Sequence, residues 1–79
     1  MQVKVKSVYK HFKGDLYFVE DIAIHSETGE AYVVYRALYH NCDLYIRPYN
    51  MFISEVDKVK YSASTQKYRF ELQKIESVK

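Results

Sequence analysis

The alternation of apolar and polar residues predicts a chain built mostly from short strands. In residues 1–7, Val3 and Val5 alternate with lysines, which indicates either a short strand or an extended arm. Runs rich in tyrosine, valine and isoleucine favour further strands, because aromatic and β-branched side chains fit a pleated sheet. These strands are predicted at Tyr9–Lys13, Leu16–Ile24, Ala31–Tyr39, Leu44–Arg47 and Tyr68–Leu72, with a weak strand or a loop at Glu55–Tyr61.

Turn residues separate these runs at intervals of about 8–12 residues, a spacing typical of β-barrels and β-sandwiches. Gly14-Asp15 and the segment His25–Glu30 are predicted hairpin turns, and Gly29 can adopt the positive φ that a tight turn requires. His40–Asp43 is predicted to form the next turn. Pro48 must end a strand, and a proline at the first helical position favours one helical turn over 49–53.

We therefore expect an all-β domain of five to six short strands, with a short helical turn after Pro48. One domain should occupy residues 1–79, with its core at about residues 8–73 and with frayed termini. Two helical alternatives remain open, at Glu55–Lys60 and at Gln66–Lys79. The second is supported by Tyr68, Leu72 and Ile75, which follow a helix-like spacing.

Composition narrows the class of protein. A chain of 79 residues with one cysteine, Cys42, cannot form an internal disulfide, so an aromatic-rich core must supply the stability. Without a long apolar run or a signal-peptide pattern, we expect a cytoplasmic protein with no membrane partner. The net charge of +2 allows an acidic partner without requiring one.

Aromatic and basic side chains alternate on several predicted strands, a pattern that suits either an extended peptide or stacked nucleobases. The alternative is that the rings fill the core and the basic groups cover the surface. Phe52 is expected to plug the open end of a barrel. The candidate ligand-binding residues are Tyr9, His11, Lys13, Tyr35, Arg36, Tyr45, Arg47 and Met51.

Catalytic and metal chemistry have little support. The turn at His25–Glu30 is better explained by turn formation than by acid–base chemistry. Cys42 lies near His40 and Asp43, but no third orienting group or oxyanion donor is identifiable. His11, His25 and His40 lack metal-ligand spacing. We expect no catalytic residue, metal or cofactor.

Several segments resemble a small bacterial family catalogued as domain of unknown function 1653. The resemblance spans about residues 8–56, and its motifs are YKHFKG at 9–14, HSETGE at 25–30, VVYRALY at 33–39, Arg47-Pro48 and Met51-Phe52. It implies a compact SH3-like barrel and no established activity. The chain differs from the family in having Tyr45 where tryptophan is common. It also has the turn His40–Asp43 in place of a glycine-containing turn; there Asn41 is expected to tolerate a left-handed conformation.

These observations favour a non-enzymatic binding module for a protein or peptide partner, with a groove bounded by Tyr9, Tyr35, Tyr45 and the Pro48 turn. The first alternative is a nucleic-acid-binding module that uses the same aromatic–basic face. The second is a small-molecule sensor or an enzyme, which would need a concave pocket with convergent polar groups. A homodimer formed through an edge strand is a further alternative.

Overall fold

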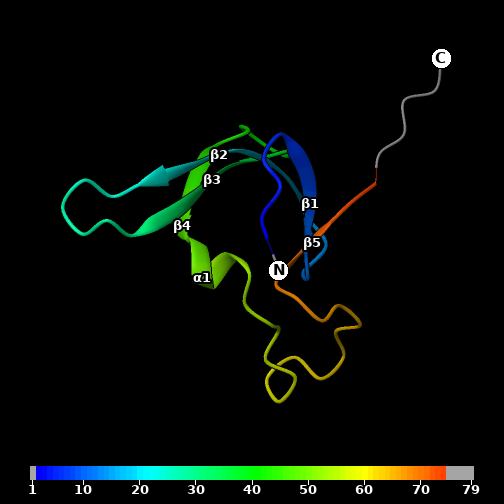
Figure 1. The fold of residues 1–79 in the computed structure, drawn as a ribbon. Coiled ribbons are helices and arrows are strands. Elements are labelled where there is room, and N and C mark those ends of the chain that lie inside the picture. Colours follow the sequence, from blue (N-terminus) through cyan, green and yellow to red (C-terminus); the bar gives the residue numbers. More distant parts are fainter. Residues whose placement is uncertain (1, 75–79) are drawn as a thin grey trace.

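The computed structural model describes residues 2–74, which form one curved antiparallel sheet with a single helical turn (Figure 1). The sheet order is β4-β3-β2-β1-β5. The mostly β class and the helical turn after Pro48 are confirmed. The bounds are β1 (Ser7–His11), β2 (Leu16–Ile24), β3 (Ala31–Ala37), β4 (Leu44–Pro48), α1 (Tyr49–Phe52) and β5 (Phe70–Leu72).

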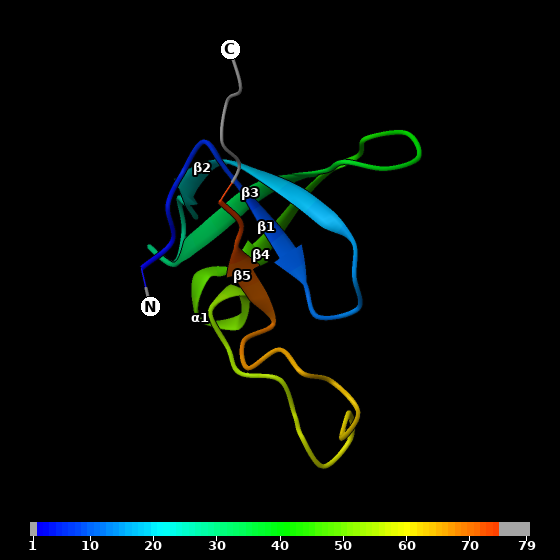
Figure 2. The same cartoon turned by 90° about the vertical axis from the view of Figure 1, so that its right-hand side faces the viewer.

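The sheet is not closed into a barrel within this part of the chain, because β4 and β5 are its two edges and do not pair with each other. The sheet curves so that α1 and the N-terminal arm lie on its inner side (Figures 1 and 2). A register shift between Val19 and Asp21 interrupts the pairing of β2 with β3. Such a bulge increases the local twist of a strand.

Two of the three predicted turns contain a glycine in the conformation that such turns require. Gly14 (φ 110°) follows β1, and Gly29 (φ 74°) lies in the turn between β2 and β3; both φ values favour glycine. The third turn differs from the prediction, because His40 (φ 49°) and Cys42 (φ 55°) adopt the left-handed conformation instead of Asn41. The Arg36 guanidinium donates a hydrogen bond of 2.8 Å to the Cys42 carbonyl, which holds this turn against β3.

Aromatic rings form the centre of the core, where Phe52 and Phe70 stack with centroids 4.1 Å apart. Tyr35 contacts both rings edge-on at 5.4 Å. Phe52 is fully buried, so its predicted place in the interior is confirmed, but the sheet is not closed and has no barrel end for Phe52 to plug. Each such aromatic pair adds about 0.5–1.5 kcal/mol beyond the burial of its area. The core also includes Val3, Tyr9, Val19 and Val33.

The N-terminal arm is extended and packs on this core without joining the sheet. Val3 is buried, and its backbone N–H donates to the Tyr49 hydroxyl at 2.9 Å. The N–H of Lys4 donates to the Tyr9 hydroxyl at 2.8 Å. These two bonds satisfy phenol oxygens at the margin of an apolar core, where an unpaired polar atom would be costly. Of the two predicted forms the extended arm is observed, but from Val3 on it is packed and not frayed, and Val3 extends the core beyond the predicted start at about residue 8.

A long loop of residues 53–69 connects α1 to β5 and extends below both elements (Figure 2). The weak strand at Glu55–Tyr61 is reduced to one bridge, between Glu55 and Tyr68. The predicted closing strand is present at Phe70–Leu72, and residues 66–74 contain no helix. The helical alternative at Gln66–Lys79 is therefore wrong for residues 66–74, and residues 75–79, with Ile75, lie outside the described part.

Candidate functional site

The structure separates the predicted site residues, and two of them belong to the core. Tyr9 is 1% exposed and Tyr35 is 4% exposed, so neither ring can wall an open groove. This corrects the predicted groove. The sequence did not settle the orientation of these strands, because both faces of the Ala31–Tyr39 run carry apolar side chains. Burial in a small core is the usual role of such large rings.

The two arginines of the predicted face lie on opposite sides of the sheet. Arg47 points inward, where its Nε donates to the Tyr35 hydroxyl at 3.1 Å and its guanidinium lies 5.6 Å from the Phe70 ring centre. Arg36 points outward and pairs with Glu20 at 3.2 Å. Because successive side chains of a strand alternate between faces, Arg36 cannot share a surface with Tyr35. The aromatic–basic residues therefore do not form one face.

His11 lies at the end of β1, between the Phe12 ring at 4.5 Å and the Phe70 ring at 4.9 Å. Its Nδ1 accepts a hydrogen bond of 3.1 Å from the backbone N–H of Lys13. Burial, together with the positive charges of Arg47, Arg69 and Lys13, lowers the pKa of His11 from 6.5 to about 4, against the opposing effect of the Asp15 carboxylate. His11 is therefore neutral at pH 7 and lies in a locally positive field.

The outer edge of β4 carries the most continuous exposed apolar run. Leu44, Tyr45 and Ile46 are 50%, 42% and 65% exposed. Met51, on the adjacent turn α1, is 48% exposed, and α1 contacts β4. Tyr45 also packs against Tyr35, with centroids 5.9 Å apart. Of the predicted site residues, Tyr45 and Met51 are therefore the apolar ones that solvent reaches.

The hydrogen-bonding pattern shows which backbone groups of β4 are unpaired. Ala37 N–H donates to the Asp43 carbonyl at 2.9 Å, and the register then pairs Tyr45 with Tyr35 and Arg47 with Val33. In an antiparallel ladder, bonding alternates along the strand. The backbone groups of Leu44 and Ile46 consequently point away from β3, and no other described segment bonds to them.

A second exposed feature lies where the turn after β1 meets the long loop. Phe12 and Tyr61 pack with centroids 4.8 Å apart beside a hollow of about 450 Å³. Lys13 and Lys60 also line it, and we call it the Phe12–Tyr61 hollow. Phe12 and Lys13 belong to the predicted aromatic–basic pattern, although only Lys13 was among the candidate ligand-binding residues. Lys60 and Tyr61 were not predicted, because they lie in a segment whose alternation is weak. The one sequence feature that marks them is a tyrosine next to a lysine in a long polar stretch.

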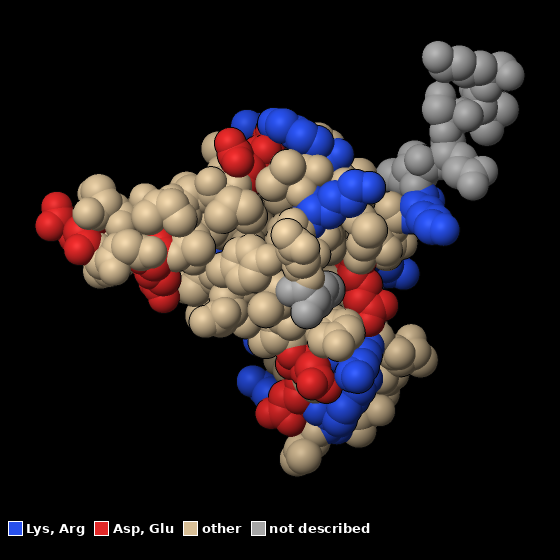
Figure 3. All heavy atoms as spheres, viewed as in Figure 1, with Lys and Arg blue, Asp and Glu red and all other residues tan. Residues whose placement is uncertain are grey.

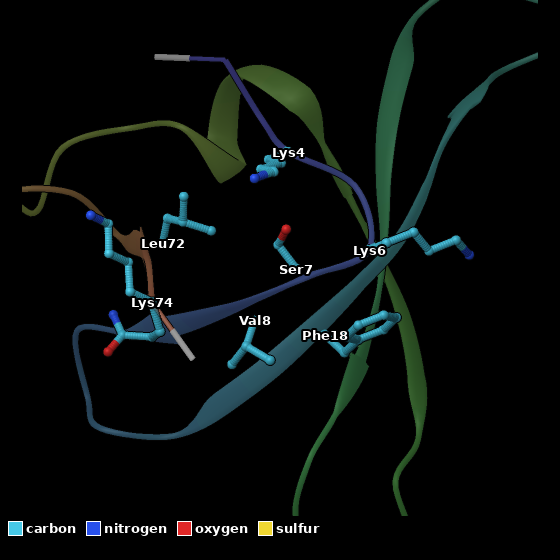
Figure 4. A pocket seen from close by; sticks show the side chains of 8 residues that line it. Lys4, Lys6, Ser7, Val8, Phe18, Leu72 and Lys74 are labelled. Carbon is cyan, nitrogen blue, oxygen red and sulfur yellow. The ribbon is translucent and has the colours of Figure 1, made fainter. Parts of the chain in front are cut away.

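A larger hollow, of about 540 Å³, lies beside the start of β1 and the end of β5. Lys4, Lys6 and Lys74 line it together with apolar side chains such as Val8 and Phe18. Figure 4 shows the Lys6 and Lys74 side chains extending in opposite directions. Lys6 is also 3.7 Å from Glu20. The lysines therefore do not converge on a common anion position.

Charge is distributed locally and does not form one dominant face. In the space-filling view, acidic side chains mark the tip of the β2–β3 hairpin, and acidic and basic side chains mix over the long loop (Figure 3). Within residues 2–74, no three His, Cys, Asp or Glu side chains are grouped so that they could hold a metal ion. Among the described helices, none has the length and apolarity needed to cross a membrane.

The fold and these surfaces define a small, mostly β domain with an open edge strand. Residues 7–72 match the model of the family described as protein of unknown function (DUF1653), so the chain belongs to the DUF1653 family. A crystal structure of a DUF1653 protein from Bordetella bronchiseptica is similar, with a TM-score of 0.76 and 30% sequence identity. The similarity covers 100% of this chain and 99% of that one. No curated protein is significantly similar in sequence.

Proposed function

We propose that the domain is a non-enzymatic binding module that captures an extended peptide segment of a protein partner along β4. One observation carries this proposal: β4 is an edge strand whose Leu44, Tyr45 and Ile46 are all exposed. An exposed apolar edge is a template for pairing with another chain, and proteins usually protect it with charges, prolines or a covering segment. Here the protection is limited to Arg47 and Pro48 at the end of the strand.

The bound peptide would add a strand to the sheet. The outward N–H and carbonyl groups of Leu44 and Ile46 would supply the backbone hydrogen bonds, and Pro48, which lacks an N–H, would end the row of donors. The Leu44 and Ile46 side chains would contact one face of the peptide, and Tyr45 with Met51 the other. A partner segment with apolar residues on both faces fits this edge.

The finer description of the fold supports the same proposal. We infer that the curved sheet is an SH3-like barrel that is left open between β4 and β5. Such an opening is what leaves β4 without a neighbour. We also place the module in the cytoplasm, where the exposed thiol of Cys42 would stay reduced.

The test begins by selecting extended peptides from a displayed random library on the wild-type domain. Their affinity is then measured for Ile46→Pro, which removes an outward donor without removing a bond to β3. We expect affinity to fall about tenfold or more, because a hydrogen bond is lost and the ring obstructs the edge. A second pair of variants supplies a matched control: Ile46→Lys changes β4, and Ile24→Lys makes the same change on β2. Ile24 is 64% exposed, and β3 separates its strand from β4.

Ile46→Lys should weaken peptide binding, and Ile24→Lys should leave it unchanged. Failure to select any peptide, or equal binding by folded Ile46→Pro, would refute the assignment. Sedimentation of the protein without peptide tests self-pairing. A dimer that Ile46→Pro dissociates would show that the edge serves a second copy of this chain, and the peptide proposal would then be wrong.

A further inference from the structure

The Phe12–Tyr61 hollow combines two half-buried aromatic rings with two exposed lysines and lies at the edge of the sheet opposite β4. Phe12 comes from the turn after β1, and Tyr61 comes from the long loop. The Lys13 ammonium lies 5.9 Å from the Phe12 ring centre and 5.5 Å from that of Tyr61. The Lys60 ammonium lies 5.4 Å from the Tyr61 ring centre. Two cations therefore share one pair of rings.

The loop that carries Tyr61 has a fixed shape. The Lys58 ammonium donates to the carbonyls of Ser64 at 2.8 Å and Gln66 at 2.7 Å. The Gln66 side-chain amide donates to the Lys10 carbonyl at 2.8 Å and so ties the loop to β1. Loops of this length without regular structure are uncommon in compact domains and are often functional. Tyr61 is therefore held beside Phe12 by the loop's own hydrogen bonds.

The charge at this site favours an anion. No acidic side chain lines the hollow, and neither Lys13 nor Lys60 forms a salt bridge with any residue from 2 to 74. Within the loop, the Asp57 carboxylate accepts hydrogen bonds from the backbone N–H groups of Val59 and Lys60. Lys13 also contributes to the positive field that lowers the pKa of the neighbouring His11, where the Asp15 carboxylate acts in the opposite direction.

We propose that the Phe12–Tyr61 hollow binds single-stranded nucleic acid, with a base stacked on Tyr61 and edge-on to Phe12, whose ring is tilted by 59° from that of Tyr61, and with the adjacent phosphates on Lys13 and Lys60. A planar, polyanionic ligand satisfies the rings and the lysines together, as in other proteins that bind single strands without sequence preference. Base stacking is stronger than an exposed cation–π contact, so a base can displace the lysines toward its phosphates. This site is independent of the peptide edge at β4.

The experiment measures fluorescence anisotropy of a labelled oligothymidine of about eight nucleotides, a length within the range bound by one small β domain. The titration starts at low salt and is repeated at increasing salt. Tyr61→Leu should weaken binding about 5- to 150-fold, the loss expected for one stacked base. Lys60→Gln should reduce the slope of log affinity against log salt by about 0.7, the value for one phosphate contact on a single strand.

Lys67→Gln is the matched control. It removes the same charge from the same loop, and the Lys67 ammonium lies 5.4 Å from the ring of Tyr68, outside the hollow. It should change affinity much less than Lys60→Gln. An equal effect of the two variants, or equal binding of an abasic oligomer, would show that only charge is recognised and would overturn the site.

Two further results would also overturn the proposal. One is the absence of binding at low salt. The other is binding of thymidine monophosphate as tightly as the oligomer, which would make a free nucleotide the ligand. The variant Ile46→Pro should bind the oligomer like the wild type. This result separates the hollow from the β4 edge, so either proposal can fail alone.

Discussion

The two edges of the sheet differ in how they are covered. The chain that leads into β5 has a neighbour on its outer side, because Arg69 N–H donates to the Ser54 carbonyl and Val56 N–H donates to the Lys67 carbonyl, both at 2.8 Å. Glu55 and Tyr68 form a bridge between these bonds. Val56 is only 6% exposed, so its side chain seals this edge as well.

The β4 edge has no such neighbour within residues 2–74, and Leu44 and Ile46 stay exposed there. Residues 54–56 of the long loop pair with residues 67–69, just before β5, and no described segment pairs with the outer side of β4 in this way. The chain therefore includes a loop long enough to lie beside an edge strand. A shortage of chain does not explain why β4 has no neighbour. Peptide capture is assigned to β4 and not to β5 because three consecutive apolar side chains are exposed on β4, whereas on the three-residue β5 only Leu72 is exposed.

The largest expected effect is a loss of stability, and it should differ between an aromatic residue on β5 and one on β4. Phe70→Ala on β5 should lower the free energy of unfolding by about 3–5 kcal/mol, because it empties the centre of the core. Tyr45→Ala on β4 should cost about 1 kcal/mol, since the ring is 42% exposed. Urea denaturation followed by circular dichroism measures both.

If Phe70→Ala leaves no folded protein, Phe70→Leu gives a measurable smaller loss in the same direction. Equal losses for the β4 and β5 variants would contradict the division between a core side and an open edge. The difference matters for function, because only a residue that contributes little to stability can be changed freely in a binding experiment.

Proline substitution tests the covering of the two edges directly. Val56→Pro removes the hydrogen bond to Lys67 at the covered edge and should cost about 2–3 kcal/mol, since the Lys67 carbonyl loses its donor. Ile46→Pro removes an N–H that has no partner within the described chain, and its cost should stay within about 1 kcal/mol. Thermal unfolding of both variants measures the contrast. A larger loss for Ile46→Pro would mean that the outward N–H is bonded.

Much of the fold was predictable because local chemistry determines it. The alternation of residues located the strands, Gly29 marked a hairpin, and Pro48 marked both the end of β4 and the start of α1. Barrel closure was not predictable, because it depends on contact between edges far apart in the sequence. The turn at His40–Asp43 also could not be derived, since contact with Arg36 helps to set its conformation.

The candidate site was less predictable than the fold. Tyr9 and Tyr35 are of a residue type that is common on binding faces. Only the folded sheet shows that both side chains point into the core. Tyr45 and Met51 were predicted and remain accessible. The pairing of Phe12 with Tyr61 joins residues far apart in sequence through a loop with no periodic pattern, so no local feature could reveal it.

The smallest expected effect concerns His11, whose ring contacts Phe70 of the core on the β5 side of the sheet. The pKa of His11 is about 4 in the folded state and 6.5 in its ordinary state, so the unfolded chain takes up a proton more readily. The contribution of His11 to the free energy of unfolding is therefore fully present above about pH 6.5 and is lost as the pH falls toward 4. Since solvent partly screens His11, we expect a loss of about 1 kcal/mol between pH 7 and pH 5.

His11→Asn should remove this loss while keeping an acceptor near the Lys13 N–H. The control is His25→Asn, because His25 Nδ1 likewise accepts from a backbone N–H, that of Glu27, but lies in the exposed hairpin turn. Urea denaturation of the three proteins at pH 7 and pH 5 measures the difference. If His11→Asn keeps the full pH dependence, other groups cause it, and burial together with the charges of Arg47, Arg69 and Lys13 lowers the pKa of His11 less than inferred from the structure.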